Sequence, residues 1–384
     1  MQVGIIGAGT MGMGIAQVAA QAGHAVVLYD GRPGAVEQAV QTLRATLGKL
    51  VAKGKLAPSE ADAALARITP CGALVDMAPC ELVVEAIVED LAAKKKLFTD
   101  LELVLGSQAV LASNTSSLSI TAIAAACKSP ERVIGLHFFN PAPLMPLVEV
   151  VPGLLTATGL AERMHQLMAR WGKSPVLCKD TPGFIVNRVA RPYYGESIRI
   201  FEEGIADMAS IDHALKSVGG FRMGPFELMD LIGNDINFAV TRSVWEAFFF
   251  EPRYKPSLTQ QRQVESGRLG RKTGQGYYTY GDGAALPPPV VPAALANAIT
   301  ERVLAMLINE AADALFLKVA SKGDLDLAMQ KGVNYPKGLL AWADEQGAGH
   351  WTAVLDALQA EYGEERYRAS PLLRRMARTG AHFH

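Results

Sequence analysis

The sequence has little of the features that mark several protein classes. Only 4 of its 384 residues are cysteines and none forms a C-x-x-C pair, which is typical of reduced structural thiols rather than of a disulfide or zinc framework. Lysine and arginine (37) nearly balance aspartate and glutamate (38), so nothing indicates a nucleic-acid partner. No apolar run is long enough for a membrane span, and no cationic-then-apolar leader opens the chain. We therefore expect a cytoplasmic protein with no membrane partner.

The first 180 residues predict a sheet domain. Short apolar runs alternate there with longer helical patterns, which is typical of a mostly parallel sheet covered by helices. The expected strands are 3–6, 25–30, 82–86, 109–112, 133–137 and 147–151. Between the second and third strands, a helical insert at about 35–67, broken near 54–58, is expected to stand off the sheet as a hairpin.

Helical patterns replace strands after Thr181-Pro182. Residues 181–282 are expected to form a helical domain, 283–294 a proline-rich linker and 295–384 a second copy of that domain, because 301–347 repeats 187–233 at an offset of 114. Chance similarity of two helical patterns is the alternative. The expected fold class is α/β: an N-terminal Rossmann-type, mostly parallel sheet domain followed by an all-α C-terminal domain that is duplicated. The pairs in register include Arg188/Arg302, Glu196/Glu310, Asp212/Asp326, Gly224/Gly338 and Asp230/Asp344.

A glycine-rich motif, G-A-G-T-M-G at 7–12, lies between the first strand and a helix-forming stretch. In this context such glycines form a dinucleotide-binding turn, with the pyrophosphate at the helix N-terminus. Asp30 ends the second strand, where a carboxylate binds ribose hydroxyls and repels a ribose phosphate, so the pattern favours NAD over NADP; Arg32 could weaken that repulsion. A tight turn without a ligand is the alternative. The residues assigned to the cofactor here are Gly7, Gly9, Thr10, Met11, Gly12 and Asp30.

Two other strands bring acid–base residues together. The strand at 133–137 ends in His137, and a nine-residue spacer with three prolines separates it from the strand at 147–151. Because that spacer is too short for a crossover helix, the second strand must return antiparallel, which places Glu149 beside His137. Alcohol oxidation by NAD needs such a pair, since the imidazole removes the hydroxyl proton while hydride leaves carbon. A backbone-satisfied histidine and a solvated glutamate are the alternative.

Three further positions allow both structural and functional interpretations. Ser116 and Ser117 lie at a strand end but could also cap the helix expected at 118–126. Asn187 lies about six residues into an expected helix, where asparagine is mildly unfavourable, and the repeat has Glu301 in its place. The other histidines show no metal-ligand spacing beyond the terminal His-Phe-His, which is expected to be a frayed tail. No metal is predicted.

Together these segments resemble, in order and spacing, the L-3-hydroxyacyl-CoA dehydrogenase family over residues 1–280. The resemblance implies an NAD-dependent dehydrogenase with His137 as general base and Glu149 as its partner. The matching segments, besides the glycine motif, are V-E-A-I-V-E-D at 84–90, S-N-T-S-S-L at 113–118, G-L-H-F-F-N-P at 135–141, L-V-E-V at 147–150, T-P-G-F-I-V-N-R at 181–188, M-G-P-F-E-L at 223–228 and G-R-L-G-R-K-T-G-Q-G-Y at 267–277.

The resemblance implies further roles. Ser116 and Asn187 would hold the substrate's 3-oxygen and the nicotinamide in place, and Glu89, Lys94 and Asn114 match positions that contact NAD. The repeated C-terminal segment is similar to the duplicated module of a bacterial branch that acts on 3-hydroxybutyryl-CoA or 3-hydroxyadipyl-CoA.

An acyl-CoA substrate needs cations for its phosphates, and Lys53 and Lys55 of the helical insert are the nearest candidates; a solvated helix face is the alternative. Simple family members dimerise through the helical domain, so we expect the two copies to form an internal pseudo-dimer, with a homo-oligomer left open. Two other functions are alternatives. One is a sugar-acid 3-dehydrogenase of the same superfamily, which has no use for CoA contacts; the other is a non-catalytic NAD-binding protein.

Overall fold

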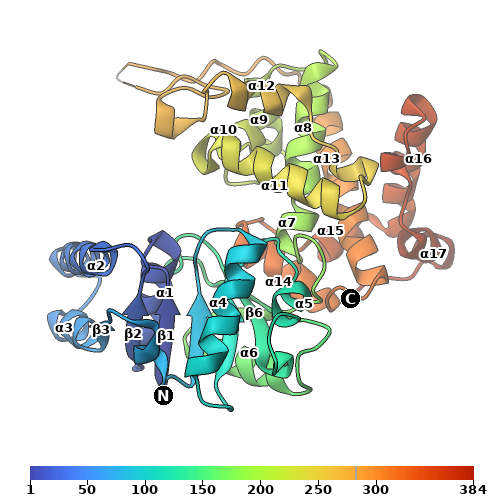
Figure 1. The fold of residues 1–384 in the computed structure, drawn as a ribbon. Coiled ribbons are helices and arrows are strands. Elements are labelled where there is room, and N and C mark those ends of the chain that lie inside the picture. Colours follow the sequence, from blue (N-terminus) through green and yellow to red (C-terminus); the bar gives the residue numbers. More distant parts are fainter. Residues whose placement is uncertain (282) are drawn as a thin grey trace. The chain divides into compact units, whose positions relative to one another are not determined.

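The computed structural model describes residues 1–281 and 283–384 and divides into two units, Met1–Phe184 (unit 1) and Ile185–His384 (unit 2). Unit 1 contains the sheet, and unit 2 is helical (Figure 1). The division falls a few residues after 181, where a helical domain is expected to begin. Residue 282, at the expected end of that domain, lies outside the described residues.

Unit 1 is built on an eight-stranded sheet with the order β3-β2-β1-β4-β5-β6-β7-β8. Neighbouring strands are parallel except β6 and β7, which pair antiparallel as the proline-containing spacer predicts. The mostly parallel sheet confirms the expected fold class. The strands are β1 (Gln2–Ile6), β2 (Ala25–Tyr29), β3 (Ile68–Pro70), β4 (Leu82–Glu85), β5 (Val110–Ser113), β6 (Val133–Phe138), β7 (Leu147–Pro152) and β8 (Ser174–Leu177).

The sequence pattern missed the two edge strands. β3 has three residues and ends at Pro70, and β8 has four residues and contains Pro175. Strands this short show no periodicity, and proline argues against a strand except at an edge, where both of these lie.

The helices of unit 1 follow the βα rhythm of the sequence. The insert at 35–67 forms two helices that pack on each other and on the first helix after β1, and the second of them also contacts the edge strand β3 (Figure 1). Leu43 and Leu47, on the inner face of its first helix, are buried because they pack into the main core cluster. The helices are α1 (Thr10–Gln21), α2 (Ala35–Ala52), α3 (Pro58–Ala66), α4 (Leu91–Val104), α5 (Ile120–Ala124) and α6 (Leu160–Arg170), with 3₁₀ turns η1 (Leu74–Met77) and η2 (Pro130–Arg132).

The described residues of unit 2 form helices and 3₁₀ turns, with isolated β-bridges only at Gly270, Gln275 and Thr279. The helix expected directly after Thr181-Pro182 does not form there, because Gly183 and Phe184 adopt left-handed backbone conformations (φ 72° and 48°). Helix α7 therefore begins later and is four residues long. The elements are α7 (Val186–Val189), α8 (Arg191–Glu202), α9 (Met208–Ser217), α10 (Pro225–Ile232), α11 (Asn234–Ala247), η3 (Pro252–Tyr254), α12 (Leu258–Glu265), η4 (Arg271–Thr273), α13 (Ala293–Phe316), α14 (Lys322–Gly332), α15 (Leu339–Gln346), α16 (Ala348–Tyr362), η5 (Glu365–Tyr367) and α17 (Pro371–Thr379).

Aspartates separated by the offset of 114 make equivalent contacts in both halves of unit 2. Asp212 accepts two backbone N–H bonds at the start of α10, and Asp326 accepts two at the start of α15. Asp230 accepts two from the segment after η4, and Asp344 accepts two from the last two residues of the chain. The expectation of a frayed tail is therefore wrong: Phe383 is buried, and this tail repeats the contacts of the first copy.

Arginines at equivalent positions pair across the two halves. Arg188 Nε lies 2.5 Å from Glu310 Oε1, and Arg302 Nε lies 2.7 Å from Glu196 Oε1. Since Arg302 and Glu310 each lie 114 residues after Arg188 and Glu196, the two ion pairs are reciprocal. Helix α13 carries both second-copy residues and packs against α7, α8 and α9.

All four cysteines are free thiols. Over residues 1–281 and 283–384, there is no group of His, Cys, Asp and Glu side chains suited to a metal ion. The same residues contain no helix with the length and apolar character that crossing a membrane requires.

Candidate active site

The turn between β1 and α1 places a different constraint on each glycine. Gly7 has a φ of 101°, and a Cβ on Gly12 would lie 1.7 Å from the Gly7 carbonyl oxygen, so the turn itself requires both. A Cβ on Gly9 would meet no atom within 4 Å. Gly9 is also the N-cap of α1, and Thr10 and Met11 form the first turn of that helix. Open space at a helix N-terminus without an acidic residue in its first turn fits the pyrophosphate of NAD.

Asp30, directly after β2, is held in place by hydrogen bonds. It accepts one from the Ala8 N–H in the glycine-rich turn (2.8 Å) and others from Arg32, through its backbone N–H, Nε and a terminal guanidinium nitrogen. Chiefly because of the Arg32 side chain, the pKa of Asp30 falls to about 2. The carboxylate is therefore ionised at neutral pH, which favours ribose hydroxyls over a ribose phosphate. Arg32 pairs with it while staying 72% exposed.

A buried lysine connects the end of β4 with the loop that follows. Lys94 is 1% exposed, and its Nζ lies 2.5 Å from Glu85 Oε1 and 3.3 Å from Glu89 Oε2. Glu89 also accepts hydrogen bonds from the Thr115 hydroxyl (2.6 Å) and the Ser116 N–H (2.9 Å). Burial alone would raise the pKa of Glu89, but Lys94 and these hydrogen bonds hold it below its usual range. Lys94 therefore contacts both Glu85 and Glu89, and no sequence pattern assigns Glu85 a role in the site.

The segment after β5 lies beside this network. Asn114 Oδ1 accepts a backbone N–H from the end of β6 (2.8 Å), which ties the two strand ends together. The capping interpretation of Ser116 and Ser117 is wrong, because α5 is only five residues long and Ser119 is its N-cap. The hydroxyl of Ser117 instead donates to Glu89 (3.2 Å), and the Ser116 hydroxyl lies 3.4 Å from the same carboxylate oxygen.

His137 and Glu149 are directly opposite in the β6–β7 ladder. His137 Nδ1 lies 2.6 Å from Glu149 Oε2, and the two residues are 6% and 0% exposed. A carboxylate accepts the Nδ1–H, so the second ring nitrogen, Nε2, carries the lone pair that can take a proton. The rings of Phe139 and Phe184 pack on the imidazole, with ring centres 4.4 and 5.9 Å away. The arrangement can perform general acid–base chemistry at one nitrogen.

The loop between β6 and β7 is fixed from two sides by residues that the sequence pattern did not identify. The Nζ group of Lys173 donates hydrogen bonds to the carbonyl oxygens of Ala142 and Met145. On α1, a Cβ on Gly14 would lie 3.1 Å from side-chain atoms of Ala142 and Pro143, so helix and loop pack closely. Because these contacts join residues far apart in the sequence, no local pattern signals them.

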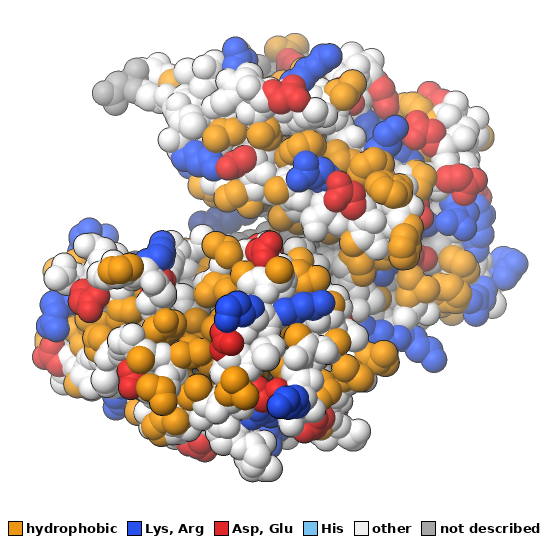
Figure 2. All heavy atoms as spheres, viewed as in Figure 1, with side chains coloured by type: hydrophobic (Ala, Val, Ile, Leu, Met, Phe, Trp, Pro, Cys, Tyr) orange, Lys and Arg blue, Asp and Glu red, His pale blue; other side chains and the backbone are white. Residues whose placement is uncertain are grey.

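The remaining assigned residues lie elsewhere. Asn187 belongs to unit 2 and is the second residue of the one-turn helix α7, not six residues into a longer helix. Lys53 and Lys55 are exposed in the turn between α2 and α3, and Figure 2 shows Lys and Arg side chains on the surface around α2.

The site defines the class of protein, an NAD-dependent oxidoreductase. It combines a glycine-rich turn on a parallel sheet, an ionised aspartate after β2 and a buried imidazole–carboxylate pair. Comparison with known proteins gives the family. Residues 2–181 match the NAD binding domain of 3-hydroxyacyl-CoA dehydrogenase, and residues 183–280 and 299–382 match its C-terminal domain. The chain belongs to the 3-hydroxyacyl-CoA dehydrogenase family, and its C-terminal domain is duplicated.

Individual relatives support this membership. A 3-hydroxyadipyl-CoA dehydrogenase of Escherichia coli K12 is 43% identical, with 98% of this chain and 97% of the relative covered. The crystal structure of a 3-hydroxybutyryl-CoA dehydrogenase from E. coli K12 superposes with a TM-score of 0.94 at 42% identity and covers 99% and 98% of the two chains. The human mitochondrial hydroxyacyl-coenzyme A dehydrogenase is 42% identical over 72% of this chain and 90% of its own.

Proposed function

We propose that the protein oxidises L-3-hydroxyacyl-CoA to 3-oxoacyl-CoA, with His137 as general base and Glu149 as its partner. The supporting observation is the buried 2.6 Å contact between Nδ1 and the carboxylate, which leaves Nε2 for the substrate. When bound, NAD supplies the hydride acceptor. His137 Nε2 takes the proton of the 3-hydroxyl, and Glu149 stabilises the imidazolium that results. In the reverse direction the same nitrogen returns the proton to the 3-oxygen.

Other residues position the two ligands. Ser116 and Asn187 bind the 3-oxygen and the nicotinamide amide, while Glu89, held by Lys94, and Asn114 contact NAD. The network that fixes Glu89 and the hydrogen bond that fixes Asn114 support this assignment, since fixed polar groups at strand ends are what a bound cofactor requires. The glycine-rich turn, with Thr10 and Met11, and Asp30 hold the pyrophosphate and the ribose.

The acyl-CoA is 3-hydroxybutyryl-CoA or 3-hydroxyadipyl-CoA, the substrates in the names of the two E. coli relatives. Lys53 and Lys55 bind the phosphates of the CoA arm. Their exposure in the turn between α2 and α3 supports this, because an exposed ammonium group on a long side chain is accessible to a phosphate.

The domain layout follows the expected bounds 1–180, 181–282 and 295–384, except that the linker expected at 283–294 ends at Pro292, because α13 begins at Ala293. The two helical copies form an internal pseudo-dimer. The reciprocal ion pairs Arg188–Glu310 and Arg302–Glu196 support the pseudo-dimer, because an isologous interface places the same residues on both sides. The protein acts in the cytoplasm, where its four free thiols stay reduced.

A substrate panel tests the proposed function. NADH consumption is measured with acetoacetyl-CoA, a longer 3-oxoacyl-CoA, a dicarboxylic 3-oxoacyl-CoA and free acetoacetate, and NADH formation with gulonate-type sugar acids. We expect turnover of the CoA thioesters and none of the free acids. Oxidation of the sugar acids alone would favour the sugar-acid dehydrogenase, and tight NADH binding without any turnover would favour a non-catalytic protein.

A further inference from the structure

The segment that carries Asn187 depends on its surroundings for its position. Helix α7 is a single turn of four residues, and two left-handed residues, Gly183 and Phe184, precede it. One helical turn has almost no stability of its own. Ala190 alone separates α7 from α8 and holds its C-terminal end, so the position of its N-terminal end depends on side-chain contacts. Arg188, the neighbour of Asn187, is 1% exposed.

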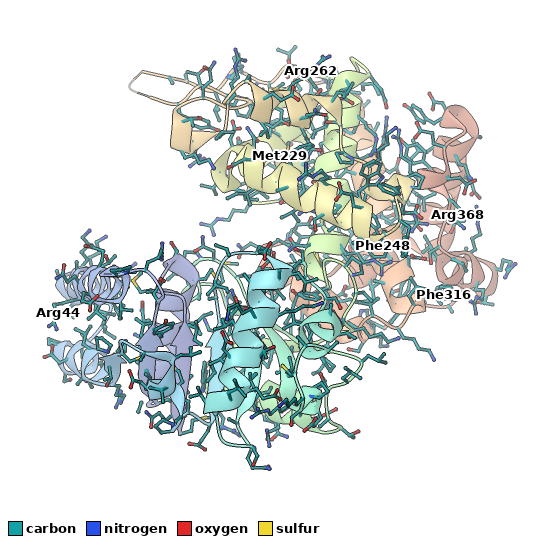
Figure 3. All side chains as sticks on the ribbon, viewed as in Figure 1. Arg44, Met229, Phe248, Arg262, Phe316 and Arg368 are labelled. Carbon is teal, nitrogen blue, oxygen red and sulfur yellow. The ribbon has the colours of Figure 1, made fainter. Side chains whose placement is uncertain are left out.

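The second helical copy binds the Arg188 guanidinium. Nε lies 2.5 Å from Glu310 Oε1, and a terminal nitrogen lies 3.1 Å from Asp313 Oδ2, both on α13. The Tyr254 hydroxyl donates to the same Glu310 oxygen (2.6 Å). On another side, Arg188 Cζ lies 5.1 Å from the ring centre of Phe248, which is labelled at the end of α11 in Figure 3. The guanidinium is thus held by charge, hydrogen bonds and an aromatic ring.

The cluster is balanced in charge. Glu310 and Asp313 face two arginines, Arg188 and Arg253, whose closest approaches to Glu310 are 2.5 and 3.5 Å. Burial alone would raise the pKa of Glu310, but the two arginines and the Tyr254 hydroxyl hold it below its usual range. Glu310 is therefore an ionised partner, and its loss would leave a buried guanidinium undercompensated.

The reciprocal cluster has the same construction but a different neighbour. Arg302 lies 2.7 Å from Glu196 and 2.7 Å from Glu203. The residue before Arg302 is Glu301, whose half-exposed carboxylate lies 3.0 Å from His350 Nε2. Equivalent arginine–glutamate pairs therefore hold the residue after an asparagine in one copy and the residue after a surface glutamate in the other.

We propose that Glu310 is a positioning residue of the dehydrogenase site: by holding Arg188 it fixes the α7 turn so that Asn187 meets the substrate. This inference rests on the proposed function, since the role of Asn187 belongs to it. The second copy, which lacks an asparagine at the equivalent position, thereby completes the site to which the first copy contributes.

The reciprocal pairs provide a matched experiment on the full-length chain. Glu310→Gln and Glu196→Gln each remove one buried carboxylate from an equivalent arginine. We expect both to lower the thermal midpoint by similar amounts. At a temperature where both are folded, Glu310→Gln should lower kcat/KM for acetoacetyl-CoA by about 10- to 100-fold, because misplacing a substrate-holding group has this effect. Glu196→Gln should keep kcat/KM within about twofold. Equal losses in both variants, or no loss in Glu310→Gln, would overturn the inference.

A double variant separates the inference from the proposed function. If Glu310 acts through Asn187, Asn187→Ala combined with Glu310→Gln loses no more kcat/KM than Asn187→Ala alone. Additive losses would overturn the positioning role while leaving the proposed function intact. Full activity of Asn187→Ala would instead refute the role of Asn187 itself. If Glu310→Gln does not fold, Asp313→Asn and Glu203→Gln, which alter partly exposed carboxylates beside the two arginines, repeat the comparison with the same expected difference.

Discussion

Replacing Glu149 by Gln isolates the electrostatic part of the proposed mechanism. The change keeps the shape of a side chain that is fully buried opposite His137, but it removes the negative charge 2.6 Å from Nδ1. Proton removal from the substrate creates a positive imidazolium beside this position. The variant should therefore slow the chemical step and leave the glycine-rich turn and Asp30 unchanged.

The magnitude follows from the separation of the two charges. The positive charge is delocalised over the imidazolium ring and the negative charge over the carboxylate, so the two charge centres lie about 4 Å apart. At an effective dielectric constant of about 20, the attraction between them is worth about 4 kcal/mol. Since about 1.36 kcal/mol corresponds to a tenfold change in rate, full loss slows the step about 10³-fold. The glutamine oxygen can still accept the Nδ1–H, which retains part of the effect. We expect kcat to fall by about 10²- to 10³-fold.

The assay is steady-state oxidation of 3-hydroxybutyryl-CoA at saturating NAD, with NADH affinity measured by fluorescence titration. We expect unchanged NADH affinity, and in a His137→Gln background Glu149→Gln should cause no further loss, because the carboxylate acts through the imidazole. A kcat within about threefold of the parent protein would refute the reasoning, since general-base catalysis is worth at least about 10²-fold.

Three further perturbations test other parts of the site. Gly9→Ala should leave the thermal midpoint unchanged, because its Cβ meets no atom within 4 Å, yet weaken NADH binding at least about tenfold by filling the approach of the pyrophosphate; an unchanged dissociation constant contradicts this. Asp30→Ala frees Arg32 and should raise the use of NADP relative to NAD at least about tenfold, measured as the ratio of kcat/KM values; an unchanged ratio contradicts it. Burial lowers the pKa of Lys173 to about 8, whereas the value in an unfolded chain is about 10.4. Between these two pH values the unfolded chain holds a proton that the folded chain has released, so the free energy of unfolding rises with pH. The thermal midpoint of the parent protein should therefore rise between pH values of about 8 and about 10.4, and that of Lys173→Met should not. Identical pH profiles of the two thermal midpoints contradict this.

Local chemistry made several features predictable from the sequence. Three prolines in a nine-residue spacer exclude a crossover helix, so the antiparallel return of β7 and the meeting of His137 with Glu149 follow from chain geometry. The fixed offset of the repeat likewise anticipates the equivalent contacts of Asp212 and Asp326.

Other features depend on contacts between distant segments and have no local signal. Asp180 accepts hydrogen bonds from Ser119 and the next two backbone N–H groups, about sixty residues earlier, and helps to start α5. Glu85 and Lys94 meet across the loop between β4 and α4, nine residues apart, a spacing that matches neither helix nor strand periodicity. Phe184 adopts a left-handed backbone conformation, which shortens the helix expected there. Phenylalanine rarely adopts this conformation, and no propensity predicts it.

Substitution of His137 by Gln tests most directly whether this imidazole is the acid–base group. With acetoacetyl-CoA and NADH, the proposed mechanism predicts a turnover at least about 10²-fold below that of the parent protein, with the NADH dissociation constant unchanged. Turnover equal to that of the parent protein, or loss of NADH binding in proportion to loss of turnover, would contradict it.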